Sequence, residues 1–270
     1  MTGKAEVIHS HIWNEQPEID NPFAAAACYC RGYDVYGELL SKASFVEYLY
    51  LLFAGERPTP TQAALLERLA IALANPGPRE ASVHAAMCAG VGGSPAAAAL
   101  MAALGVGAGN LGGGHEVRVA MEAWQRLGCD VAAWQSFLAD PPQPERADIW
   151  TPMEHAPGFD PHGASCATPV LQTLAALAAI AAGPHLPWLA THREALQNAA
   201  GVPLALSGVA AAACRDLGLG AEQGEMLYLL LRLPGAAVHA LEQKEYGFRR
   251  FPFFHGAVKY VGPGADTPEA

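Results

Sequence analysis

The chain has 270 residues, 51% of them hydrophobic and 16% charged, so it is long enough to bury a sizeable core. Its formal net charge is −10 and no Lys/Arg cluster stands out, which argues against nucleic acid as a partner. The apolar runs are broken before they reach about 18 residues, and the N-terminus lacks the apolar core of a signal peptide, so we expect a cytoplasmic protein without a membrane span.

The first 140 positions favour helices. Their apolar residues are mostly Ala and Leu, with few β-branched residues. Phe45, Leu49 and Leu52 recur at helical spacing, and Gly55 marks the end of that helix. Ser94, followed by Pro95, predicts the capped start of another. We expect helices over 36–54, 59–75, 81–93, 94–109, 116–128 and 130–140.

The second half repeats this pattern after an irregular segment. Residues 140–163 are rich in proline and aperiodic, so we expect a long loop there. Further helices are expected over 168–183, 186–201, 202–218 and 221–247, followed by an extended tail. No strand-like alternation of any length occurs, so the sequence predicts an all-α fold.

The six cysteines show no CxxC spacing. Cys28 and Cys30 would point to the same side of a strand but would diverge on a helix. Because most of the cysteines stand in apolar surroundings, we expect reduced core thiols. No set of metal ligands is indicated, so we expect no metal.

The segment "LGVGAGNLGGGHEVRVAMEAW", 104–124, crowds glycines in front of a His-Glu pair. Gly107, Gly109 and Gly112 match GxGxxG by count, but that dinucleotide motif requires a preceding β-strand, and the residues here predict a helix. A plain interhelical turn and an active-site loop remain. The neighbouring His115 and Glu116 favour the active-site loop.

Three further motifs, taken in order, resemble the citrate synthase superfamily. "RGYDVYGELLSKASFVEYLYLLFAGERPT" is similar to its N-terminal signature, and "APGFDPHGASCATPVLQTL" stands where the family has GFGHxxxxxDPR. "YLLLRLPGAAVHALEQKE" resembles its R-x-x-G-x-x-x-H-x-x-E-Q helix. The match covers nearly the whole chain, and it is best for the short citrate synthase-like or citryl-CoA lyase-like proteins, which are related to the C-terminal module of ATP-citrate lyase.

The resemblance implies a two-domain helical fold and a homodimer. It places a large domain at 1–117 and 225–270 and a small domain at 118–224. It also implies that the substrates are a coenzyme A thioester and a small carboxylic acid, between which a carbon–carbon bond is made or broken. That chemistry needs a base beside the thioester, a donor for the enolate and cations for the acid.

Several catalytic positions of the family are altered here. The loop histidine falls on Gly112, the catalytic aspartate falls on Pro203 or Leu204, and the arginine of DPR falls in "SCAT". We therefore expect a rearranged site in which His115 serves as the enolate donor, with Glu116 beside it. The alternative for this pair is capping of the helix N-terminus, where a carboxylate is favoured.

The other expected site residues follow from the same resemblance. His162, one residue late in the GFGH-like segment, is a candidate catalytic residue or a solvated loop histidine. Coenzyme A is expected to contact Pro157, Gly158 and Phe159. Arg232 matches a substrate-binding arginine, with a buried ion pair as the alternative. Arg249 or Arg250 would reach a neighbouring subunit's cleft.

Three functions follow as alternatives. The first is a CoA-dependent lyase or synthase with a rearranged site, acting on a partner less charged than oxaloacetate. The second is a catalytically silent homologue that binds CoA or regulates an active paralogue. The third, an interaction protein unrelated to CoA, is disfavoured by the retained motifs.

Overall fold

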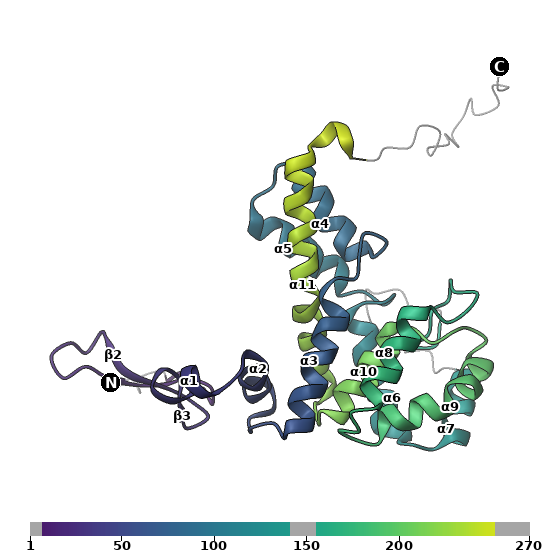
Figure 1. The fold of residues 1–270 in the computed structure, drawn as a ribbon, viewed down its shortest axis with the longest axis horizontal. Helices are drawn as coiled ribbons and strands as arrows, with labels where there is room; N and C mark the ends of the chain where they lie inside the picture. The colour runs from purple at the N-terminus through teal and green to yellow at the C-terminus, as the bar shows by residue number, and fades with distance from the viewer. Residues whose placement is uncertain (1–6, 141–154, 252–270) are drawn as a thin grey trace, which may run out of the picture.

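The computed structural model describes residues 7–140 and 155–251, and these residues are mainly helical (Figure 1). The expected long loop lies partly outside the described residues, and the expected tail lies mostly outside them. From α2 onward each α-helix buries apolar residues of its sequence pattern, whereas the short α1 has no buried residue. Their bounds are α1 Leu40–Lys42, α2 Phe45–Ala54, α3 Pro60–Ala74, α4 Ala81–Val91, α5 Ala96–Gly107, α6 Gly114–Leu127, α7 Val131–Ala139, α8 Thr168–Ala178, α9 His185–Ala200, α10 Leu206–Asp216 and α11 Ala221–Tyr246, with a π-helical turn η1 Val35–Leu39 and a 3-10 turn η2 Phe248–Arg250.

The predicted all-α fold is confirmed, with the addition of a small sheet that the sequence did not predict. Strands β1 Asn14–Pro17, β2 Ala25–Cys30 and β3 Tyr33–Asp34 pair antiparallel in the order β1-β2-β3. In β2, Cys28 and Cys30 are both buried, as two residues on one side of a strand. The sheet and α1 extend away from the helical body (Figure 1).

Helix α11 is the axis of the molecule. Its first half packs in the body, beside α3 and α6, while its second half rises out of the body together with α4 and α5 (Figure 1). The main core joins α3 with α6–α10 and the first half of α11. A second, smaller core of mostly small residues holds α4, α5 and the second half of α11 together.

The predicted domain division stays a prediction. The main core contains Leu65 and Tyr228, from the expected large domain, together with Trp124 and Leu177, from the expected small domain. The body is therefore packed continuously across the predicted bounds.

The starts of α2 and α10 lie later than those of the expected ranges 36–54 and 202–218, and the start of α5 differs from the prediction in its cap. Helix α5 begins at Ala96 with Pro95 as its N-cap residue, and no side chain caps it. Ser94 instead takes part in the turn that ends α4, since its N–H donates to the carbonyl of Ala89 at 3.0 Å. The expected Ser94 cap is wrong, because the chain has to close α4 before α5 can begin.

Candidate active site

The glycine segment is shorter than the sequence indicated. Gly105 and Gly107 lie inside α5 and Gly114 begins α6, so only 108–113 link the two helices. Gly112 has φ +63°, and a Cβ on Gly113 would overlap the carbonyl of Gly109. Glycine is therefore required at both positions, for a left-handed conformation and for a close approach respectively.

The peptide groups of Gly112 are the centre of a polar network. Its N–H donates to Glu116 Oε2 at 2.5 Å. Its carbonyl accepts from the Tyr228 hydroxyl at 2.8 Å and from Arg232 Nη1 at 2.5 Å. The loop is therefore held from the α6 side by a carboxylate and from the α11 side by a phenol and a guanidinium.

Glu116 joins three segments that are distant in sequence. Its side chain is 1% exposed. Oε1 accepts from the Gly158 N–H at 2.7 Å and from the Ser207 hydroxyl at 3.0 Å. The capping alternative stays a prediction: Oε2 binds the N–H of Gly112, one residue before the N-cap residue Gly113 of α6, while Oε1 reaches out to Gly158 and to Ser207 of α10.

His155 stands beside this carboxylate. Its Nε2 lies 3.6 Å from Glu116 Oε1, and the His155 side chain is 9% exposed. Nε2 has no hydrogen-bond partner in the structure. A buried polar atom of this kind next to a carboxylate is uncommon, and it marks His155 as part of the site.

The PGF loop, which we define as Pro157, Gly158 and Phe159, is buried. Phe159 is 4% exposed and forms an isolated bridge with Leu204. Gly158 has φ +87°. Its carbonyl oxygen lies so close to Gly208 that a Cβ on Gly208 would overlap this oxygen. The three residues that we expect to contact CoA are therefore packed in the core. Their contact with CoA stays a prediction.

Arg232 is engaged in an ion pair. Its Nη2 donates to Glu80 Oε2 at 2.7 Å, and Nη1 donates to the Tyr228 hydroxyl as well as to Gly112. Burial opposes its charge, but Tyr228 and Glu80 outweigh burial and raise the pKa of Arg232. Burial also raises the pKa of Tyr228 above its usual range, so its hydroxyl stays protonated and can donate to Gly112.

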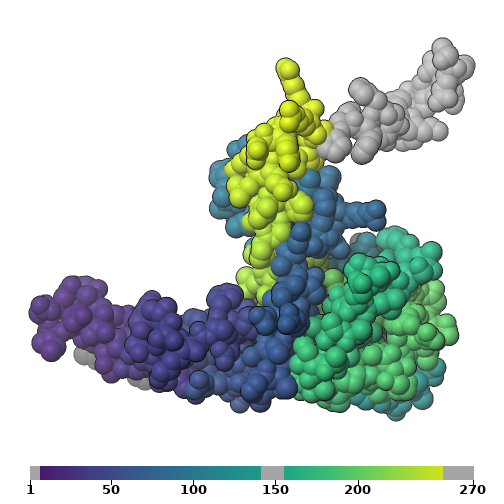
Figure 2. Space-filling view, in the orientation of Figure 1, coloured from purple at the N-terminus to yellow at the C-terminus, as the bar shows by residue number. Residues whose placement is uncertain are grey.

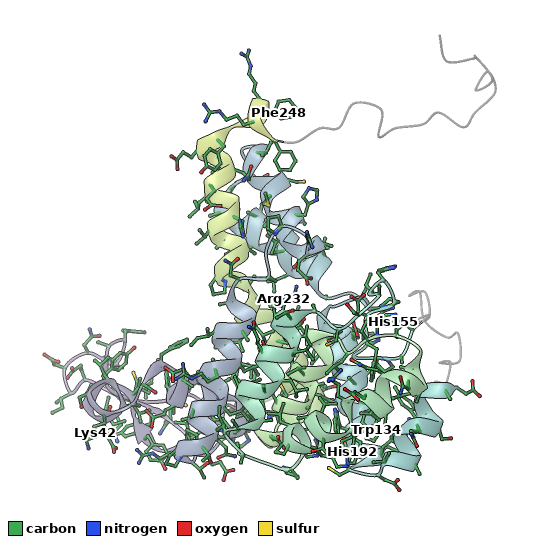
Figure 3. The ribbon with its side chains drawn as sticks, turned by 45° about the vertical axis from the view of Figure 1, so that its right-hand side comes forward. Lys42, Trp134, His155, His192, Arg232 and Phe248 are labelled. Atoms are coloured by element: carbon green, nitrogen blue, oxygen red, sulfur yellow. The ribbon has the colours of Figure 1, made fainter. Side chains whose placement is uncertain are left out.

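The remaining predicted residues lie outside this network. His115, at the start of α6, is exposed, and its N–H donates to the carbonyl of Ala108 at 3.3 Å. His162 is exposed in an Asp160 turn. Arg249 and Arg250 are exposed in η2, beyond the end of α11, which places them roughly 20 Å along the helix from Arg232 (Figure 3). The structure thus unites Glu116, Gly158 and Arg232 but not His115, His162, Arg249 and Arg250.

Four residues of the network were missed in the sequence: Glu80, His155, Ser207 and Tyr228. Tyr228 could have been found, because it stands four residues before Arg232 and thus on the same helix face. Glu80 and Ser207 lie 152 and 91 residues away from their respective partners Arg232 and Glu116, and no local pattern reveals contacts of that range. His155 directly precedes the quoted APGF segment.

An open pocket lies beside the segment that follows the PGF loop. It has a volume of about 390 Å³ and is lined by the segment from Gly163 to Cys166, by Arg193 and Gln197 of α9, and by the turn from Gly201 to Pro203. Volumes of this size are typical of sites for part of a small-molecule ligand. It is joined to the PGF loop through the hydrogen bond from Asp160 N–H to the carbonyl of Pro203, at 2.8 Å.

Chemically, the network combines a buried carboxylate, a buried guanidinium and the backbone N–H and carbonyl groups of two loops. Within 7–140 and 155–251, no group of three or more His, Cys, Asp or Glu could hold a metal ion. In the same part of the chain, no helix has the length and apolar character to cross a bilayer.

Comparison with known proteins gives a consistent fold. No protein-family model and no curated protein matches the sequence. Among solved structures, citryl-CoA lyase from Hydrogenobacter thermophilus superposes with a TM-score of 0.72 at 20% identity, over 98% of this chain and 97% of that one. The ATP citrate lyase of Methanothrix soehngenii, in complex with citrate and coenzyme A, also gives a TM-score of 0.72 at 18% identity, over 96% of this chain and 42% of the lyase.

A citrate synthase from Thermoplasma acidophilum, solved with carboxymethyl coenzyme A and oxaloacetate, is similar with a TM-score of 0.54 at 15% identity, over 85% of this chain and 60% of that one. These likenesses establish the fold. The chain has the helical fold of citrate synthase and citryl-CoA lyase, and the expected resemblance is confirmed at that level.

Proposed function

We propose that this chain makes or cleaves a carbon–carbon bond between an acyl-CoA and a keto acid, using a rearranged active site. One observation carries the proposal: Glu116 binds the glycine loop, the PGF loop and α10 together. These are the segments in which the resemblance places the acyl-CoA cleft, and the fold supports the same arrangement.

The residues have distinct tasks in this proposal. Glu116 positions the two loops, and Arg232 holds the carbonyl of Gly112. His115, exposed at the start of α6, supplies the donor for the enolate oxygen. His162 lies one residue before the pocket-lining segment that begins at Gly163, so it can serve as a second proton carrier.

Coenzyme A is the proposed substrate carrier, with no metal involved. The PGF loop is the proposed contact for its thioester end. The pocket of about 390 Å³ is lined by residues that follow this loop in the chain, from Gly163 onward, and its Arg193 can meet a phosphate. The proposal includes a cytoplasmic protein with closure of the predicted small domain, 118–224, over the large one.

We also propose a homodimer. The arm formed by α4, α5 and the second half of α11 rises from the body (Figure 2) and has a core of small side chains. It exposes the apolar side chains of Met101, Val238 and Leu241. Exposed apolar side chains on so narrow an arm favour burial against a second copy. Arg249 and Arg250, at the tip, are the proposed contribution of each subunit to the other's cleft.

A catalytically silent CoA-binding homologue is the second candidate. The observation that favours it is that Glu116 and Arg232 already have partners within the chain, Gly158 and Glu80 respectively. In this case acyl-CoA would bind without being consumed.

Turnover separates the two candidates. The full chain is incubated with acetyl-CoA and a panel of keto acids, and separately with citryl-CoA, while free CoA and acyl products are followed by mass spectrometry. We expect product formation in at least one direction and its loss in His115→Ala, with the exposed N-terminal variant His9→Ala as control. If acyl-CoA binds but is not converted, the catalytically silent homologue is the better description. If the rates of His115→Ala are unchanged, His115 is not the donor for the enolate oxygen.

A further inference from the structure

The guanidinium of Arg232 is a buried cation whose partners are almost all neutral. Arg232 is 7% exposed. Nη1 donates to the Gly112 carbonyl and the Tyr228 hydroxyl, and Nη2 lies 3.5 Å from the Ser82 hydroxyl. Nε is buried without a hydrogen-bond partner. A buried guanidinium in such surroundings requires one anion.

Glu80 supplies that anion from the surface. Its Oε2 lies 2.7 Å from Arg232 Nη2, while its side chain is 42% exposed. Glu80 is the N-cap residue of α4, yet its side chain makes no capping hydrogen bond there. Its carboxylate therefore serves Arg232 rather than the helix, and a swing into solvent would release the guanidinium without loss of a cap.

The position of Glu80 is the one that an anionic ligand would take. Its Oε2 would lie 3.8 Å from a Cβ on Gly112, so this carboxylate stands over the glycine loop. The loop, the guanidinium and the carboxylate thus form one contact region.

We infer that Glu80 occupies Arg232 in place of a substrate carboxylate, and that it thereby sets the specificity of the site for a keto acid with a single carboxylate. This rests on the proposed function, which it deepens by naming the class of the partner acid. A second carboxylate on the ligand would have to displace Glu80 from Arg232 and would meet its negative charge. Glu80 acts here through Arg232 and the ligand's charge, as a specificity-determining residue.

Ligand binding in the absence of CoA tests the inference. Malonate and oxaloacetate, each with two carboxylates, and pyruvate, with one, are titrated calorimetrically into the full chain and into Glu80→Gln. We expect Glu80→Gln to bind both dicarboxylates at least about tenfold more tightly than the unchanged chain, with little change for pyruvate. Glu122→Gln, which removes an exposed partner of Arg118 on α6, is the matched control and should behave as the unchanged chain.

A second variant guards against loss of the fold. Glu80→Asp keeps the charge but shortens the side chain by one methylene, so it should give a smaller gain in dicarboxylate binding. Equal dicarboxylate affinity in all variants, or tight dicarboxylate binding by the unchanged chain, would overturn the inference. Tighter dicarboxylate binding by Glu80→Gln, together with no binding of CoA to the unchanged chain, would support the role of Glu80 and reject the proposed function.

Discussion

Glu116 holds more of the candidate site together than any other residue described above. It is buried, and it accepts hydrogen bonds from two backbone N–H groups and one hydroxyl on three different segments. A carboxylate has two acceptor oxygens, which the three donors share. A neutral side chain of similar length, such as glutamine, has only one acceptor oxygen and cannot bind all three donors equally well. Glu116 thus links local stability and the geometry of the site.

Replacing this carboxylate should destabilise the protein. We expect Glu116→Ala to lower the free energy of unfolding by about 3 kcal/mol, because two backbone N–H groups lose their partner at about 1–3 kcal/mol each. Urea denaturation measures this. Glu122→Ala, on the exposed side of the same helix, is the control and should cost less than about 0.5 kcal/mol. Equal stability of the two variants would mean that Glu116 does not hold the loops.

At this scale, the sequence identified residues but not their partners. Glu116 was predicted from its place beside His115 after the glycine segment, and Arg232 from the resemblance of its helix to a family motif. The contact from Glu116 to Gly158 spans 42 residues and the contact from Arg232 to Gly112 spans 120, so they depend on how the helices pack. The sequences around His115 and His162 likewise do not determine whether these side chains are exposed or point into a site.

Among the elements, the contact between α10 and the PGF loop fixes the site most tightly. The backbone of Gly158 touches that of Gly208, and the N–H of Ala205 donates to the Gly158 carbonyl at 3.0 Å. No side chain fits between the two glycines. The placement of Ser207 against Glu116 follows from this close approach.

A pair of alanine substitutions tests that packing. Gly208→Ala should destabilise the fold by about 1–3 kcal/mol, because its Cβ overlaps the Gly158 carbonyl. Gly105→Ala, inside α5 with open space around its Cβ, should stabilise it by about 0.5–1 kcal/mol through better helix propensity. Thermal or urea unfolding gives both values. The same sign for both variants would contradict the observed contact.

Helices were predictable and the small sheet was not, for a physical reason. An amphipathic helix repeats its signal over three or more turns, as α3 does with Leu65, Leu69 and Leu73. Strand β1 has four residues, all exposed, and β2 begins with three alanines, so neither shows apolar alternation. Only the spacing of Cys28 and Cys30 carried a trace of β2.

For the whole molecule, the uncovered apolar side chains are the outstanding feature. Helices α4, α5 and the second half of α11 rise from the body as a narrow arm (Figure 2), and Phe248 at the end of this arm is 78% exposed. The N-terminal segment likewise exposes Ile19 and Phe23. Such surfaces are covered in most soluble proteins, and a second copy of the chain is the proposed cover.

The mass in solution checks this proposal. We expect sedimentation at twice the 28.3 kDa of the chain, and a shift toward the single chain when Val238 and Leu241 are both changed to glutamate. Ile71→Glu, at an exposed apolar position of α3 in the body, should leave the mass unchanged. A single-chain mass for the unchanged protein at micromolar concentration would reject the dimer.

Binding of acyl-CoA is the most direct test of the proposed function. Acetyl-CoA and CoA are titrated calorimetrically into the full chain, with and without pyruvate present. We expect a dissociation constant on the order of micromolar for acetyl-CoA, with tighter binding when the keto acid is added. Absence of heat and of any thermal shift with both CoA species would reject the proposed function, and would leave the shared fold without its acyl-CoA chemistry.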